Sequence, residues 1–277
     1  MATKDREHIR RLREEANEIR RKQEAEAKRK RLVTTIGLST LAVAVVALIV
    51  VMVVFGPKWF GPKAATVAGS GNVAVMGSDG KQTEVPISMS EDGVAIMVGK
   101  PEAPVTLDYW FDFSCPHCID YHTVMDPTMK DLIVSGQAKI NYRPVNIVAP
   151  YGKEAAAALL AVMAHQPELF YSVMDGLLDI PAQEQMNWTA NDYAQHLSGL
   201  GVTNADIITE TANGTYRSKV ESNTQVARDA KLKGTPSLAV NGQMQEQLPD
   251  AAGLIALVGA NGGDVSAVPT PAAAPAA

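Results

Sequence analysis

Residues 105–118 read VTLDYWFDFSCPHC, an apolar stretch that runs directly into a Cys-x-x-Cys motif. Its first nine residues are rich in β-branched and aromatic side chains that alternate with others, which predicts a β-strand. Ser114 or Cys115 can then cap a helix, and Pro116 suits its first turn because proline lacks an N–H that would have no partner there. The stretch therefore predicts a strand followed at once by a helix that begins at the cysteine pair.

The segments that follow predict an α/β domain with a helical insertion. The first helix should continue to about residue 134, and a second strand is expected at 138–145. A further short strand should begin at Thr235-Pro236 and end in the Asn-Gly turn signal at residues 241–242. Helical periodicity predicts further helices at 153–165, 168–179, 190–198, 204–212, 217–232 and 251–259. Strand, helix, strand, helices, strand and helix is an α/β order.

The chain has two cysteines, and both lie in this one motif. A structural disulfide normally closes a long loop, and so short a loop would restrict the unfolded chain very little. A helix N-terminus, in contrast, stabilises the thiolate of Cys115, and His117 can add a hydrogen bond or a positive charge. Cys118 lies one turn deeper on the same face, as expected of a resolving thiol. Stabilising the reduced form makes the disulfide form an oxidant.

Zinc binding is the main chemical alternative. Cys115, Cys118 and His122 share one helical face, but a closed zinc site needs four ligands and no second CxxC or HxxxH completes one. We therefore expect neither a metal nor an organic cofactor.

The N-terminal region predicts a membrane anchor. Residues 1–31 carry twelve Lys or Arg and seven Asp or Glu, whereas the whole chain has a net charge of -5. Residues 32–55 are uncharged and long enough to cross a hydrocarbon core of roughly 30 Å. A cleaved secretory signal is the alternative, but its apolar region is usually shorter. The basic head places the N-terminus in the cytoplasm and the rest of the chain outside. Arg and Glu interleave in that head at helical spacing, so we expect no nucleic-acid partner.

Composition sets the remaining boundaries. Residues 56–85 are rich in Gly, Ser and Lys and are predicted to be a juxtamembrane linker. Residues 86–261 form the expected globular domain, with the helical insertion at about 150–232. Residues 262–277 are rich in Pro and Ala, and we expect a disordered tail there.

The chain resembles the DsbA-like branch of the thioredoxin superfamily over about residues 95–260, in the membrane-anchored form common in Gram-positive bacteria. The motifs that carry the resemblance are GKPEAP at 99–104, FDFSCPHC at 111–118 and GTP at 234–236. The resemblance implies a thioredoxin-like fold with a helical insertion. It also implies that Pro236 follows a cis peptide bond facing the disulfide, with the backbone of Thr235 offered to the substrate chain. The expected site residues are thus Cys115, Pro116, His117, Cys118, Thr235 and Pro236.

One position departs from that family. Thioredoxin-like enzymes often carry a buried carboxylate six residues before the first cysteine, and here that residue is Tyr109. Asp108 and Asp112 should face the other way if the strand alternation holds. Asp112 is therefore either a proton acceptor for Cys118 or a solvated charge.

These features predict an extracytoplasmic, single-pass membrane enzyme that introduces disulfide bonds into secreted or surface proteins. Its partners would be thiols of unfolded secreted proteins and a quinone-linked membrane thiol oxidase that reoxidises the pair. The alternatives are a reductase or isomerase of the same fold, an anchored chaperone or binding protein, and an enzyme dedicated to one partner.

Overall fold

A computed structural model describes residue 28 and residues 67–90 and 93–269. The chain divides into two compact units, Met1–Pro62 and Lys63–Ala277, and the second contains all of the described residues except Lys28. Within the described residues, no helix is both long and apolar enough to cross a membrane. Apart from Lys28, the predicted basic head at 1–31 and the predicted membrane span at 32–55 lie outside the described residues.

The core of the second unit is a mixed sheet of seven strands in the described part of the chain, in the order β1-β2-β3-β5-β4-β6-β7. The strands are β1 (Ser70–Met76), β2 (Gln82–Met89), β3 (Ile96–Val98), β4 (Val105–Phe111), β5 (Ala138–Pro144), β6 (Ser237–Val240) and β7 (Gln243–Met244). The interior strand β4 pairs in parallel with β5 and antiparallel with β6. Its residues 105, 107, 109 and 111 are at most 1% exposed, because they belong to the hydrophobic core.

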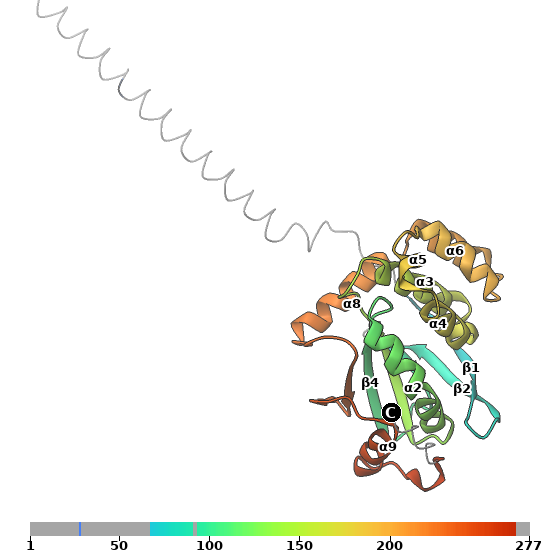
Figure 1. Cartoon of the computed structure of the whole chain (residues 1–277), viewed down its shortest axis with the longest axis vertical. Helices are drawn as coiled ribbons and strands as arrows, with labels where there is room; N and C mark the ends of the chain where they lie inside the picture. Colours follow the sequence, from blue (N-terminus) through green and yellow to red (C-terminus); the bar gives the residue numbers. More distant parts are fainter. Residues whose placement is uncertain (1–27, 29–66, 91–92, 270–277) are drawn as a thin grey trace, which may run out of the picture. The chain divides into compact units, whose positions relative to one another are not determined.

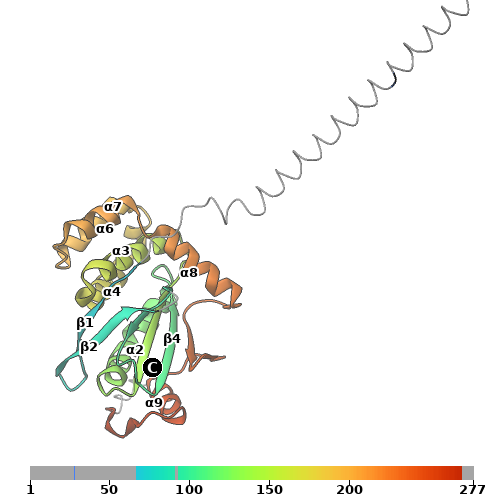
Figure 2. The ribbon, with the colours of Figure 1, turned by 180° about the vertical axis from the view of Figure 1, so that it is seen from behind.

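Helices supply the connections between the strands. They are α2 (Pro116–Val134), α3 (Tyr151–His165), α4 (Phe170–Leu178), α5 (Ala182–Gln185), α6 (Ala190–Gly199), α7 (Ala205–Asn213), α8 (Arg217–Asp229) and α9 (Ala251–Ala260). Helix α2 is the crossover that parallel strands β4 and β5 require. Helices α3 to α6 gather at one end of the sheet, and α9 lies near α2 at the other end (Figure 1). The predicted helical insertion is confirmed, and the reverse view shows the same grouping (Figure 2).

The prediction that residues 56–85 are a linker is wrong from residue 67 onward. Strands β1 and β2 form an antiparallel hairpin at the edge of the sheet, with Val73 opposite Val85. These two side chains and Val75 are at most 2% exposed. The period-two alternation of valines was present in the sequence, but glycine and polar residues around it concealed the strand. The turn contains Gly80, whose φ of 75° is easily reached without a side chain.

The predicted disordered tail is also corrected in its first part. Residues 265–267 form a 3-10 turn, in which the Asp264 side chain accepts a hydrogen bond from the Ser266 backbone N–H at 3.1 Å. Val268 is 7% exposed and, with Val265, packs against the core, so two valines suffice to order this segment. Residues 270–277 lie outside the described part of the chain.

Candidate active site

The cysteine pair lies where β4 ends and α2 begins. The Cys115 backbone N–H donates to the Asp112 carbonyl at 3.0 Å, which turns the chain out of the strand. Cys115 is the N-cap residue in an extended conformation, and Pro116 opens the helix. The backbone N–H groups of Cys118 and Ile119 donate to the Cys115 carbonyl at 2.9 and 3.2 Å. This geometry puts the Cys115 sulfur at the positive end of a 19-residue helix, where a thiolate is stabilised.

The two sulfurs are free thiols in different surroundings. Cys115 is 3% exposed and Cys118 is 0% exposed, so an incoming group reaches Cys115 first. Burial raises the pKa of Cys118 far above its usual value, and the nearby Cys115 raises it further. The Asp112 backbone N–H lies 3.4 Å from Cys118 Sγ and acts in the opposite direction, because it stabilises the thiolate. Cys118 therefore holds its proton firmly in the reduced form.

The loop before β6 approaches the cysteines from a position 120 residues further along the chain. The Thr235–Pro236 peptide bond is cis, which confirms the expectation drawn from the family resemblance. The Cys115 thiol donates a hydrogen bond to the Thr235 carbonyl oxygen at 3.3 Å. The structure thus brings the Cys-Pro-His-Cys turn and Thr235-Pro236 together.

A largely apolar groove of about 510 Å³ adjoins the cysteine turn. Its lining comes from α2, from the loop at Pro236 and from the segment before α9: His117, Asp120, Tyr121, Val124, Met125, Pro236, Leu248, Pro249 and Asp250. Pro116 and His117 are exposed beside it. Val124, which lines the groove, is 67% exposed although it is apolar. The sequence did not single out Val124 or Leu248, because nothing in it tells which apolar residue faces solvent.

Asp112 organises the turn. It is fully buried, so the prediction of a solvated charge is wrong. One carboxylate oxygen accepts hydrogen bonds from the Ser114 backbone N–H at 2.8 Å and its hydroxyl at 2.6 Å. The other accepts from the backbone N–H groups of Ile147 and Val148 at 2.6 and 2.9 Å. Strand β4 ends at Phe111, so Asp112 lies one residue beyond the part of the chain in which side chains alternate.

Close packing supports this carboxylate. The Ser114 hydroxyl also accepts from the Ala149 backbone N–H at 2.9 Å, so the loop after β5 is held to the cysteine turn at three points. Gly152, in the first turn of α3, lies so close that a Cβ there would collide with the Asp112 and Ser114 side chains. Asp108 has a different role and pairs with Arg143 Nε at 2.7 Å.

His122 does not join the cysteines, so the zinc alternative gains no third ligand from it. Its Nε2 lies 2.8 Å from Asp175 Oδ1 on α4. His122, Asp126 and Asp175 do place ligand-type atoms within 4.8 Å of one another. The Lys130 ammonium, however, lies 2.5 Å from Asp126 and 3.7 Å from Asp175, and it already supplies the positive charge between them.

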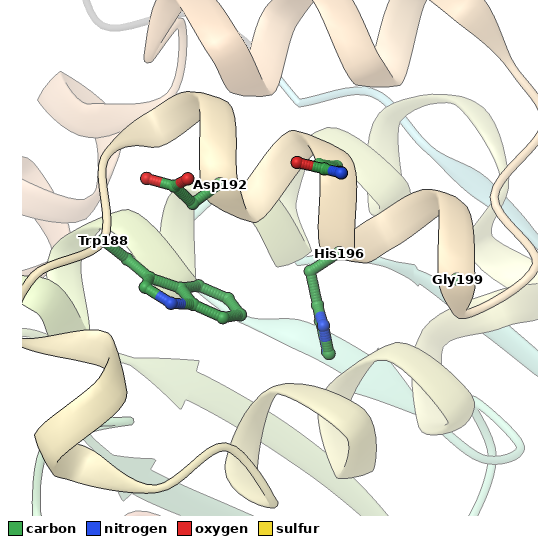
Figure 3. Close-up of a pocket in the computed structure, with 5 residues that line it drawn as sticks. Trp188, Asp192, His196 and Gly199 are labelled. Atoms are coloured by element: carbon green, nitrogen blue, oxygen red, sulfur yellow. The ribbon is translucent and has the colours of Figure 1, made fainter.

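A second pocket, of about 350 Å³, lies on the helical insertion (Figure 3). The Trp188 and His196 rings face each other across it, with centroids 5.3 Å apart. Its lining comes from α6 and the residue preceding its N-cap, and it contains none of the site residues expected from the sequence.

The fold agrees with comparisons to known proteins. Disulfide bond formation protein D of Bacillus subtilis is 26% identical over 163 residues, which cover 56% of this chain and 71% of the relative. Thiol:disulfide interchange protein DsbA of Salmonella typhimurium is 28% identical over 191 residues, or 68% of this chain and 84% of the relative. The oxidised BdbD structure from Bacillus subtilis superposes with a TM-score of 0.54 at 20% identity and covers 69% of this chain and 98% of its own.

The protein is thus a thiol-disulfide oxidoreductase of the DsbA type. Residues 91–259, more than half of the chain, match the thioredoxin family, and the chain belongs to that family. The predicted thioredoxin-like fold and enzyme class are confirmed.

The Asp112→Asn substitution tests the central carboxylate. An amide cannot accept four hydrogen bonds, and its NH₂ group would face backbone donors, so we expect the free energy of unfolding to fall by roughly 2–4 kcal/mol. Asp120→Asn, an exposed residue of α2, should change it by less than about 0.5 kcal/mol. Chemical denaturation of the full chain measures both, and equal stabilities would contradict the assigned role.

Proposed function

We propose that this enzyme introduces disulfide bonds into secreted or surface proteins outside the cytoplasmic membrane, with Cys115 and Cys118 as its redox pair. The observation that carries the proposal is the asymmetry of the two sulfurs. Cys115 lies at a helix N-terminus against the Thr235 carbonyl, and Cys118 is buried behind it. Cys115 is thereby suited to react with a substrate thiol. Cys118 is suited to be the leaving group when the disulfide opens and to re-form the disulfide afterwards.

The reaction starts from the Cys115–Cys118 disulfide. A substrate thiolate attacks Cys115 Sγ, the disulfide breaks, and Cys118 leaves as a thiolate that takes up a proton. A second substrate thiolate then attacks the substrate sulfur of this mixed disulfide, and Cys115 leaves as a thiolate. The substrate loses two electrons in forming its disulfide, and the enzyme pair gains them.

The neighbouring residues support the first step. Pro116 starts the helix that stabilises the Cys115 thiolate, and the exposed His117 offers a donor or a positive charge next to it. Thr235 and Pro236 present a backbone edge along which an extended substrate chain aligns. The apolar groove beside them suits the apolar segments that an unfolded protein exposes. A closed, polar site would instead favour a small thiol.

Each turnover leaves the pair reduced, so a partner must reoxidise it. We propose a quinone-linked thiol oxidase in the same membrane. Residues 32–55 would anchor the enzyme there by a single helix, with residues 1–31 in the cytoplasm and the redox domain outside. Anchoring two proteins in one membrane raises their effective concentration for one another.

Cysteine variants of the full chain test the redox role. The oxidised protein should convert a reduced, unfolded substrate with two cysteines to its disulfide form, as read by thiol alkylation and mass. Cys115→Ser should abolish this activity. Cys118→Ser should form a stable mixed disulfide with a substrate that carries an activated thiol, because no resolving thiol remains.

The double variant Cys115→Ser/Cys118→Ser separates catalysis from simple binding. Loss of oxidation with retained suppression of substrate aggregation would assign the groove an independent chaperone role. Full oxidation by either single serine variant would contradict the proposed pair.

Membrane fractionation tests the anchor. The full chain should stay in the membrane pellet after alkaline extraction, and Ala44→Arg/Val46→Arg should release it, because each arginine at a helix centre costs about 2.5–3.5 kcal/mol of insertion free energy. Ala44→Leu is the matched control and should remain in the pellet. Extraction of the unsubstituted chain would contradict the proposed localisation.

A further inference from the structure

The groove beside the cysteine turn carries charge as well as apolar surface. Two of its lining residues are acids, Asp120 on α2 and Asp250, the residue that caps α9. Both residues are exposed. None of the described residues that line the groove is Lys or Arg, and its one imidazole, His117, cannot neutralise two carboxylates. The lining is therefore negative whether or not His117 is protonated.

The described part of the chain supplies no counter-ion to either acid. The Asp120 side chain has no hydrogen bond or ion pair among the described residues. The Asp250 carboxylate accepts a hydrogen bond from the Gly253 backbone N–H at 2.7 Å, but no basic side chain in the described residues pairs with it. Asp108, in contrast, pairs with Arg143 Nε at 2.7 Å. Both groove acids can thus pair with a cation that enters the groove.

The two walls that carry these acids are fixed to one another. The Tyr121 hydroxyl, on α2, donates a hydrogen bond to the Pro249 carbonyl oxygen at 3.1 Å. Pro249 immediately precedes Asp250, so this bond holds the segment before α9 against α2. A groove whose walls are already in place binds without the entropic cost of ordering them.

The same groove exposes apolar side chains. Val124 and Leu248 line it and are 67% and 38% exposed. A Lys or Arg side chain matches this mixed surface, because three or four methylene groups carry a charged end group. Its stem can cover the apolar lining while its end group pairs with a carboxylate. An uncharged apolar side chain would cover the lining but remove water from the carboxylates without replacing it.

The groove begins beside the reactive sulfur. Pro236 lines it, and the Cys115 thiol donates to the carbonyl oxygen of the preceding Thr235 at 3.3 Å. Asp120 lies five residues after Cys115 on α2, or about 7.5 Å along the helix axis. An extended chain covers that distance in two or three residues. A cationic residue at that separation from a substrate cysteine would reach the groove while the cysteine reaches Cys115.

We propose that the groove selects substrate segments with a lysine or arginine two or three residues from the reacting cysteine. This inference rests on the proposed oxidation of substrate thiols and names the class of segment that reacts fastest. The cationic end group pairs with Asp120 and Asp250, and its stem lies over Val124 and Leu248. Charge complementarity also speeds association, and a substrate with Asp or Glu at these positions is disfavoured by repulsion.

Three synthetic peptides test this selection. They share one apolar sequence around a single cysteine and differ only at the second and third residues on either side, which are Lys, Gln or Glu. Neighbouring residues of an extended chain point to opposite faces, so one of each pair can face the groove. The oxidised full chain is mixed with an excess of each peptide at low ionic strength. Acid quenching, alkylation and mass then give the second-order rate constant for opening of the enzyme disulfide.

The variant Asp120→Asn/Asp250→Asn removes both groove charges. Asn caps a helix about as well as Asp does, so α9 keeps its cap. The Lys peptide should react about three- to tenfold more slowly with this variant than with the unsubstituted enzyme, since each exposed ion pair contributes roughly 1.4- to 5-fold. The Glu peptide should react faster with the variant. The Gln peptide should keep its rate, which shows that the variant is folded and active.

Comparing one peptide across proteins cancels the effect of its own charges on its thiol. The control variant Asp179→Asn/Glu184→Gln removes the same charge from two exposed acids of the helical insertion and should leave all three rates unchanged. The preference of the unsubstituted enzyme for the Lys peptide should also shrink at about 1 M salt, where screening acts within roughly 3 Å.

The outcomes separate this inference from the redox function on which it rests. A Lys-peptide rate that is the same for the groove variant and the unsubstituted enzyme would overturn the selection. An equal loss of rate in the control variant would assign the effect to net charge and would overturn it as well. If none of the peptides opens the enzyme disulfide, the proposed redox function itself fails.

Discussion

The buried carboxylate of Asp112 is the interaction on which the site depends. It receives four hydrogen bonds, two from the cysteine turn and two from the loop after β5. Strands β4 and β5 run in parallel, so both connections emerge at the same edge of the sheet. A charge at that edge must be compensated, and backbone N–H groups do so without a counter-ion. The carboxylate thereby fixes where α2 begins and where the Cys115 sulfur lies.

The site has two halves with opposite demands. The outer half needs access and a stabilised thiolate, and it consists of Cys115, the exposed Pro116 and His117, and the groove lined by Val124 and Leu248. The inner half needs to exclude water, and it contains the fully buried Cys118. One helix serves both, because its N-terminus lies at Cys115 and its buried face carries Cys118.

The sequence predicts those parts of the fold and of the site in which a local pattern of residues determines the structure. A strand that runs into Cys-Pro-His-Cys has few alternative structures, and Thr235-Pro236 was identified through a family resemblance. The hairpin of β1 and β2 was missed because an edge strand needs only one buried face, and Val73, Val75 and Val85 are separated by polar residues and glycine. The role of Asp112 stayed open in the sequence, because this residue lies one position beyond the end of β4, where the alternation of a strand no longer predicts the direction of a side chain.

The most direct test of the account is the reduction potential of the Cys115–Cys118 pair, measured on the full chain by equilibration with glutathione and thiol alkylation. A thiolate stabilised at a helix N-terminus favours the reduced form, so the account predicts a potential close to the roughly -120 mV of the oxidant DsbA. A potential close to the roughly -270 mV of thioredoxin would contradict it and assign the pair to a reductase.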